Sequence, residues 1–322
     1  MNKYLKIITN KRILIPIGIS CLGLYLAFHD FNLDEFNNSL RSLNYYLVGV
    51  TCLSLIISVW LRAIRWKLLF RNGIEISTFN LFKNQLIGYF GNNILPLKFG
   101  EVIRSYLIGK EHNIASTYVF GTIINEKIMD MITLLLLFLL LFSIKTIEFS
   151  LYKYLIALLL AIVISVLIVA LFIFFKEKIS SKGFIRELIN GMQSIECNQL
   201  HKFLLLSLSI WIIYWLNIYL VGMAFHFNLS LSDCLILLVI ITTIISIPSA
   251  PGMIGTFHLA SKYVMVDILG YDIDESNAFS IVLHSYSYIT YSVLGAYFFI
   301  FNQYRGNSIN SYINYSQTKL EE

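Results

Sequence analysis

The chain has 322 residues, of which 57% are hydrophobic and only 13% charged, with a formal net charge of +5. Soluble domains usually carry about 25% charged residues, so this composition excludes a soluble globular protein and predicts an integral membrane protein. Its basic residues lie mainly near the ends of apolar runs, which favours a role in membrane orientation over nucleic-acid binding.

Apolar runs of spanning length recur along the chain. A transmembrane helix needs about 20 apolar residues, and in lipid the backbone polar groups of a single segment are satisfied by helical hydrogen bonds. We therefore predict an all-α polytopic membrane protein. The six candidate spans are residues 13–28, 45–61, about 125–144, 153–175, 203–225 and 277–301.

Two further apolar segments, residues 80–110 and 234–269, are interrupted in the middle by Pro and Gly. The first contains GNNILPLKFGEVIR and the second contains PSAPGMIGTFH, so both include the pattern Pro-x-x-x-Gly. Broken helices in matching halves of a chain are typical of transporters built from inverted repeats. Two unrelated proline kinks in ordinary spans are the alternative.

The charges of the loops predict which side of the membrane each faces. The N-terminal arm and the segments after the second and fourth spans are rich in Lys and Arg, so we expect them in the cytoplasm. Loops 29–44 and 271–277 are mainly acidic, and we expect them outside. The protein is then a multi-pass protein of the cell (inner, cytoplasmic) membrane with both termini in the cytoplasm.

The predicted sides of the loops are consistent with one another if each broken segment returns to the side of the membrane from which it entered. Segment 80–110 is then a re-entrant helical hairpin from the cytoplasm, and segment 234–269 is one from the outside. The prediction is about six full spans plus two opposed re-entrant hairpins, eight membrane-embedded elements in all. If both segments cross twice, the count becomes ten; single crossings would misplace the basic loop after the fourth span.

Residues 183–198 include GFIRELINGMQSIE, in which apolar residues recur at helical spacing opposite charged and amide side chains. This pattern predicts an amphipathic interfacial helix on the cytoplasmic surface, with a structural role. No other stretch indicates a soluble domain, so we interpret residues 1–322 as a single transmembrane domain.

Polar residues at the interruptions predict a cavity inside the membrane. Non-helical backbone at that depth is tolerated only where protein or water supplies hydrogen-bond partners. Asn92 and Asn93 in the first segment, and Ser249, Pro251 and Gly252 in the second, therefore suggest a polar cavity between the two hairpins.

Arginines at the end of the second span permit two interpretations. Arg62, Arg65 and Trp66 lie on one helical face, which is typical of anchoring at the membrane boundary. The same arginines can instead form a site for a lipid phosphate, because a guanidinium offers two parallel N–H donors to phosphate oxygens.

Charges deeper in the chain need partners, since a charged side chain at the bilayer centre costs roughly 2.5–3.5 kcal/mol. Glu101 and Arg104 are three residues apart, so we expect them to pair with each other. The third span should begin near residue 125, where solvent at the boundary accounts for Glu126 and Lys127. Asp130 lies one turn deeper, and we expect it to pair with Arg62, Arg65 or Arg104.

His258 follows the second interruption, and His284 lies in the last span. A histidine inside a membrane is more often a hydrogen-bonded structural residue than a metal ligand, and no His–carboxylate spacing here resembles a zinc site. We expect no metal and no cofactor.

The succession LRAIRWKLLF, NNILPLKFGEVIRSYLI, NEKIMDMI and IPSAPGMIGTFH resembles the transmembrane region of the lysylphosphatidylglycerol synthase/flippase family, over about residues 60 to 300. The most specific piece is Pro-x-x-x-Gly-Glu-x-x-Arg. The resemblance implies a stand-alone flippase-like domain with two re-entrant helices. The positions of the family pattern correspond here to Arg62, Arg65, Pro96, Gly100, Glu101, Arg104, Glu126, Asp130, Pro251, Gly252 and Gly255.

The chain departs from the family pattern at several positions. Lys127 stands where the family has an Arg, Met253 replaces a Gly, His258 replaces a Glu, and His284 replaces an Arg of the last span. These changes argue against a lysyl-lipid in particular. The chain also lacks the soluble aminoacyl-transfer domain of the bifunctional members, so the resemblance gives no support for lipid aminoacylation.

We therefore expect a flippase or scramblase for an anionic phospholipid or a polyprenyl-phosphate-linked glycan, with the arginines holding the phosphate from the cytoplasmic side. Alternatives are an intramembrane enzyme with Glu126 or Asp130 as base and His258 as acid, or a non-transporting scaffold. We expect no enzyme activity, membrane lipids as partners and no nucleic acid; a homo-oligomer is left open. The candidate substrate-binding residues are Arg62, Arg65, Asn93, Pro96, Glu101, Arg104, Glu126, Asp130, Pro251, Gly252, Gly255, His258 and His284.

Overall fold

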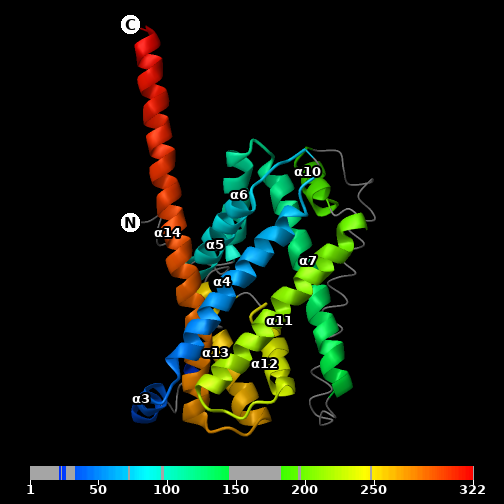
Figure 1. The fold of residues 1–322 in the computed structure, drawn as a ribbon, viewed down its shortest axis with the longest axis vertical. Coiled ribbons are helices and arrows are strands. Elements are labelled where there is room, and N and C mark those ends of the chain that lie inside the picture. The colour runs from blue at the N-terminus through cyan, green and yellow to red at the C-terminus, as the bar shows by residue number, and fades with distance from the viewer. Residues whose placement is uncertain are drawn as a thin grey trace.

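The structure is a computed structural model that describes residues 22, 24–26, 33–71, 73–95, 98–144, 183–194, 197–246 and 249–321, and the side chains of these except 35, 142–144, 197 and 302–321. Throughout this part, the regular secondary structure is helical (Figure 1). The α-helices are α3 (Leu33–Arg41), α4 (Tyr45–Lys67), α5 (Thr78–Ile94), α6 (Gly100–Glu111), α7 (Ser116–Ile144), α10 (Gly183–Met192), α11 (Leu200–Ala224), α12 (Leu231–Ile244), α13 (Thr256–Lys262) and α14 (Ile273–Glu321).

Four predicted spans coincide with long helices: 45–61 with α4, 125–144 with α7, 203–225 with α11 and 277–301 with α14. Among the described helices, α4 and α11 are long and apolar enough by length and composition to cross a membrane, and α12 is a shorter apolar helix. Spans 13–28 and 153–175 lie mostly or wholly outside the described residues.

The expected start of the third span near residue 125 does not mark the start of its helix. Helix α7 begins at Ser116, because backbone hydrogen bonding continues through the polar turn that contains Glu126. The apolar run predicts where the membrane-embedded part begins, and the helix itself starts earlier, at Ser116.

Side-chain caps explain where several helices start. The Asn44 side chain accepts hydrogen bonds from the Tyr46 and Leu47 N–H groups at the start of α4, and Ser77 accepts from the Asn80 N–H in α5. Helix α12 begins with a capping box, in which Ser230 and Asp233 bond each other's backbone N–H. Such caps satisfy amide groups that the first helical turn leaves without partners.

Residues 78–111 form a helical hairpin of α5 and α6. At its open end the Asn80 Nδ2 lies 2.9 Å from His112 Nε2. At its bend the Gly100 N–H donates to Asn92 Oδ1 at 2.9 Å. A Cβ at Gly100 would overlap the carbonyl oxygen of Gly88, so a glycine is required for the two arms to pack this closely. Pro96 lies outside the described residues.

Residues 231–268 form a second helical hairpin. Helix α12 leads into a bend with a 3-10 turn at Pro251–Met253, and the chain returns through α13 and a π-helical turn at Tyr263–Ile268. Gly252 has φ 68° and Gly255 has φ 92°, a region that glycine adopts without the steric cost of a Cβ. Both interrupted segments are therefore hairpins, and their depth in a membrane is a separate matter.

The two hairpins approach each other from opposite halves of the molecule (Figure 1). Helices α5 and α6 lie in the half that also holds α10, whereas α12 and α13 lie in the half that holds α3. Their bends make contact, because Lys98 Nζ donates to the Ile245 carbonyl at 3.4 Å. Helix α14 runs beside both hairpins, and Asn93 Nδ2 donates to its Tyr288 carbonyl at 3.2 Å.

Helix α10 corresponds to the predicted amphipathic helix 183–198, and it packs against α7. Phe184 is exposed, whereas Ile189 and Met192 are buried. Gly121 of α7 and Gly191 of α10 allow close approach of the two backbones. The helix therefore rests on the protein through one face, and residues 195 and 196 lie outside the described part.

Candidate functional site

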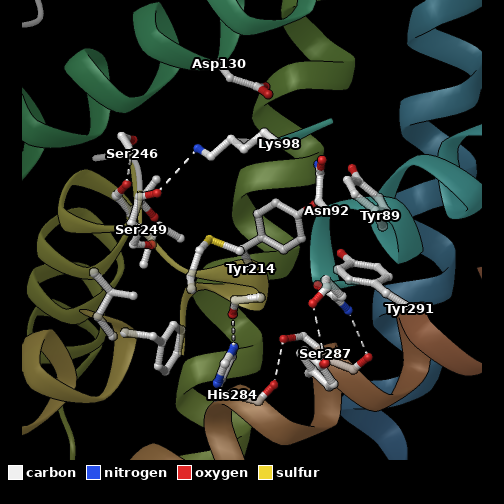
Figure 2. Close-up of a pocket in the computed structure, with 18 of the residues that line it drawn as sticks. Tyr89, Asn92, Lys98, Asp130, Tyr214, Ser246, Ser249, His284, Ser287 and Tyr291 are labelled. Carbon is white, nitrogen blue, oxygen red and sulfur yellow. Dashed lines mark hydrogen bonds between the residues drawn. The ribbon is translucent and has the colours of Figure 1, made fainter. Parts of the chain in front are cut away.

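A cavity of about 580 Å³ lies between the two hairpin bends (Figure 2). Its walls come from α4, α5, α6, α7, α11, α12, α13 and α14 as well as from both bends. Asn92, Asn93, Ser249 and Gly252 line it among a larger number of apolar side chains, so a cavity does lie between the interruptions, but most of its wall is apolar. Pockets of this size are in the range that binds small molecules.

Charged side chains line the cavity at the end nearest α7. They are Arg62, Lys98, Glu101, Lys127 and Asp130. Arg62 Nη1 lies 2.9 Å from Asp130 Oδ2, and Arg62 Nε donates to the Tyr214 hydroxyl at 2.8 Å. Lys127 Nζ lies 2.7 Å from Glu101 Oε1. Arg62 and Lys127 are thus held by carboxylates on α7 and α6, whereas Lys98 donates to the Ile245 carbonyl.

A second layer of ion pairs lies behind this wall. Arg65 Nη1 is 2.8 Å from Asp130 Oδ1, and Arg65 Nη2 is 3.8 Å from Glu126 Oε1. Arg104 Nη2 is 2.8 Å from Glu126 Oε2, and Arg104 also donates to Gln85. Arg65, Arg104 and Glu126 are buried, with at most 3% of each residue exposed. Asp130 therefore pairs with Arg62 and Arg65, as predicted, and links the two layers.

The predicted pairing of Glu101 with Arg104 is wrong. Glu101 pairs with Lys127, and Arg104 pairs with Glu126. Helix α6 directs these two side chains differently: Glu101 faces the cavity, whereas Arg104 lies over the buried ring of Trp66 at 4.6 Å. Neighbouring residues of α7 supply an opposite charge in each direction, so the pairs form between helices.

Two explanations based on solvent exposure also fail. Trp66 is fully buried and its Nε1 donates to Thr122 Oγ1 at 2.9 Å, so it does not mark a membrane boundary. Glu126 is 1% exposed, so arginines and not solvent balance its charge. Of the three arginines expected to hold a phosphate, only Arg62 lines the cavity. Arg65 and Arg104 do not line the cavity. Arg65 contacts Asp130 and Glu126, and Arg104 contacts Glu126.

At the opposite end of the cavity His284 lines the wall and is hydrogen-bonded to His258, which does not line it. His284 Nε2 lies 2.9 Å from the Gly252 carbonyl oxygen, so this nitrogen must carry a proton. In a neutral ring His284 Nδ1 then accepts from His258 Nε2 at 3.3 Å. His258 Nδ1 accepts in turn from the Ser280 hydroxyl at 2.9 Å. The histidines are hydrogen-bonded structural residues as expected, and they tie α13 and the second bend to α14.

The remaining candidate residues divide between the cavity wall and its support. Asn93, Gly252 and His284 line the cavity, whereas Pro251, Gly255 and His258 do not. The described residues contain no group of three or more His, Cys, Asp or Glu side chains that could hold a metal ion.

Sequence reasoning missed several residues of the site. Lys98 lies inside the first Pro-x-x-x-Gly pattern, which was a usable signal. Tyr89 and Tyr214 lie within helices that look like ordinary apolar segments, and nothing in their spacing distinguishes them from packing residues. Gln85 joins Arg104 to the Tyr89 hydroxyl, to which it donates at 2.9 Å.

Comparison with known proteins gives similarity over most of the chain. A family model described as the lysylphosphatidylglycerol synthase TM region matches residues 13–295. The UPF0104 membrane protein MJ1078 of Methanocaldococcus jannaschii is 26% identical over 221 residues, which cover 65% of this chain and 93% of that protein. A UPF0104 membrane protein of Methanothermobacter thermautotrophicus is 25% identical over 279 residues, 76% of this chain and 81% of the relative. No solved structure matches the chain.

Proposed function

Because the chain belongs to the family of the lysylphosphatidylglycerol synthase transmembrane region, we propose that it moves an anionic lipid between the two leaflets of the cell membrane, as a flippase or scramblase. The lipid is a phospholipid or a polyprenyl-phosphate-linked glycan. Its phosphate and headgroup enter the cavity while the tails remain in the bilayer.

The observation that carries this proposal is a cavity between two hairpin bends with positive side chains at one end. The cluster of Arg62, Arg65, Lys98, Arg104 and Lys127 with Glu101, Glu126 and Asp130 has five cations and three carboxylates, a formal charge of +2. An ionised phosphate can balance this positive charge through charge-assisted hydrogen bonds, and no residue of the cluster has to gain or lose a proton.

Arg62, Lys98 and Lys127 are the residues that we assign to direct contact with the phosphate, because they line the cavity. The described contacts of Arg62 to Asp130 and Tyr214 use two of its five N–H donors. Asp130 and the buried Arg65 are positioning residues that fix where the Arg62 guanidinium points.

Movement of the hairpins is the step that exposes the cavity to each leaflet in turn. Between the described parts of their bends, Lys98 donates to the Ile245 carbonyl. Transporters with broken helices commonly alternate by rocking one repeat against the other around a fixed site. We further propose that the α10 end of the molecule faces the cytoplasm, that the chain is multi-pass, and that both termini are cytoplasmic.

A leaflet-accessibility assay tests the function. The purified protein is reconstituted into vesicles of phosphatidylcholine with fluorescent phosphatidylglycerol or a fluorescent polyprenyl-phosphate sugar, with and without imposed proton and potential gradients. We expect at least one lipid to move about tenfold faster than in protein-free vesicles, and Arg62→Gln to remove most of that gain. If neither lipid moves faster under any gradient, the proposal is wrong.

The same vesicles distinguish transport from chemistry on the lipid. Asp130 is held between two arginines and Glu126 is buried among them, which leaves neither carboxylate free to act as a base. His258 does not line the cavity. These contacts favour transport, and we expect mass spectrometry to recover the lipid chemically unchanged.

A further inference from the structure

The cavity is charged at one end and uncharged at the other. Every lining residue with a fixed charge comes from the first half of the chain, between Arg62 and Asp130. From Trp211 onward, the described lining residues carry no fixed charge. Figure 2 shows Asp130 and Lys98 at one end of the cavity, and His284 and Ser287 at the other.

Apolar side chains form much of the uncharged end, and hydroxyl and amide groups lie among them. The Ser249 and Thr256 hydroxyls lie 3.2 Å apart, and Ser287 donates to the His284 carbonyl and keeps its lone pairs. Tyr288 and Asn93 also line the cavity, and Asn93 Nδ2 donates to the Tyr288 carbonyl and to the Ser292 hydroxyl. Hydroxyl and amide groups can both donate and accept, which suits a ligand with several hydroxyls.

This end is unsuited to an ammonium group. The carboxylates that line the described cavity are Glu101 and Asp130, and both are already paired with cations. An ammonium taken from water into the uncharged end would meet no counter-charge, which is costly. The positive formal charge of the nearby cluster adds repulsion.

Aromatic rings do not replace the missing carboxylate. An ammonium can bind over open ring faces, but several rings that line the cavity already face partners. Tyr214 faces Arg62 at 5.4 Å, Tyr89 packs on Tyr291 at 4.4 Å, and Phe257 stacks on His284 at 4.6 Å. These contacts argue against an aromatic cage for an ammonium headgroup.

We propose that the site selects lipids whose phosphate carries an uncharged, hydroxyl-rich headgroup, a glycerol or a sugar, and rejects ammonium and aminoacyl headgroups. This inference rests on the proposed function and narrows its substrate. The phosphate binds beside Arg62, Lys98 and Lys127, and the headgroup extends toward Ser287 and His284. Phosphatidylglycerol and a polyprenyl-phosphate sugar share this chemistry.

Binding of short-chain lipids tests the selectivity without requiring transport. Dioctanoyl phosphatidylglycerol, dioctanoyl phosphatidylethanolamine and a short-chain polyprenyl-phosphate hexose are titrated into the full-length protein in detergent by calorimetry. We expect the glycerol lipid, the sugar lipid or both to bind at least about tenfold more tightly than the ethanolamine lipid, a difference of about 1.4 kcal/mol. The tighter of the two identifies the source of the headgroup.

Equal or tighter binding of the ethanolamine lipid overturns the inference, and so does failure of all three lipids to bind. The outcome is independent of the transport assay. Selective lipid binding without lipid movement would support the headgroup inference and contradict the transport proposal. Movement of a fluorescent ethanolamine lipid at the same rate as the glycerol and sugar lipids would do the reverse.

A matched pair of variants tests the physical cause. Ser287→Asp supplies the carboxylate that the uncharged end lacks, and Ser287→Asn is its neutral counterpart of similar size. We expect Ser287→Asp to tighten binding of the ethanolamine lipid about tenfold and to weaken binding of the glycerol lipid, because specificity here depends on charge. The thermal midpoint of each variant reports folding. An equal effect of Ser287→Asn would contradict this cause.

Discussion

Asp130 holds two arginines at once, one at the cavity wall and one behind it. Its two carboxylate oxygens lie 2.9 Å from Arg62 and 2.8 Å from Arg65. Arg65 is fully buried, so without Asp130 its charge would keep only the more distant Glu126, at 3.8 Å. A single carboxylate therefore sets both the geometry of a proposed ligand-binding group and the stability of the region around it.

Asp130→Asn tests this dual role. The amide cannot balance two guanidinium groups, and removing one partner of a buried ion pair costs about 3 kcal/mol. We expect a free energy of unfolding lower by roughly that amount in a denaturant titration of the detergent-solubilised protein. We also expect lipid movement to fall at least about tenfold, since Arg62 loses its orientation.

Glu101→Gln is the matched control for stability. Its partner Lys127 is not buried, with 46% of the side chain exposed, so loss of this pair should cost at most about 1 kcal/mol. Equal destabilisation by the two variants would show that burial of the arginines is not what makes Asp130 important.

At the scale of elements, the two hairpins bring residues distant in sequence to one cavity. The bend after α5 contributes Lys98, and the bend after α12 contributes Ser246 and Gly252. Glycines make this arrangement possible, because Gly100 allows close packing of α5 and α6 while Gly252 adopts a positive φ beside the ring of Tyr288. Relative movement of these bends is the motion on which the proposed transport depends.

Cross-linking the bends tests that motion. Lys98→Cys and Ser246→Cys are combined in a background in which the four native cysteines are replaced by alanine, and the pair is joined with a short, reducible cross-linker that carries two thiol-reactive groups. The rate of this variant before cross-linking, which the loss of Lys98 itself lowers, is the reference. We expect lipid movement to fall at least about tenfold on cross-linking and to recover on reduction, because a tethered cavity cannot open alternately.

Each single-cysteine variant treated with the same reagent is the control for modification alone. If the cross-linked protein moved lipid at the rate of these controls, the hairpins would not need to separate. The transport proposal would then require a different opening.

At the scale of the whole molecule, the packing of the first half is repeated in the second. Helices α4 to α7 correspond in order to α11 to α14. The contact between α5 and α14 has its counterpart between α12 and α7, and α4 packs directly on α11. Contacts within each half, such as α6 with α7 and α13 with α14, also correspond. We infer an inverted repeat, with the two hairpins as equivalent elements.

The repeat and the charges together predict an orientation. Helix α14 carries the C-terminus past α5 and α6 (Figure 1), toward the end of the molecule that holds α10 and the segment after α4, which carry Arg186 and Arg71. We expect a fluorescent protein fused to the C-terminus to be fluorescent and an alkaline phosphatase fused there to be inactive, because basic loops remain cytoplasmic. The same reporters inserted at Gly270 should give the opposite pattern, and identical results at both positions would contradict the orientation.

The sequence indicated much of the site, but in an incomplete form. It predicted that Asp130 pairs with arginines and that the interruptions surround a cavity, because charges and non-helical backbone in an apolar chain require partners. It paired Glu101 with Arg104 and placed Glu126 in solvent, since spacing along one helix does not reveal what a neighbouring helix presents. Tyr89, Tyr214 and Lys98 were missed for the same reason.

What the sequence determined by itself is the class of protein and the places where its helices break: hydrophobicity and the backbone preferences of Pro and Gly act locally and can be read from a single chain. What only the tertiary structure decided is the partner of each charge and the side of the cavity that carries none. Those depend on how α6, α7 and α14 pack together. Ion pairs form between whichever charges the packed helices bring within reach, and sequence distance does not limit them.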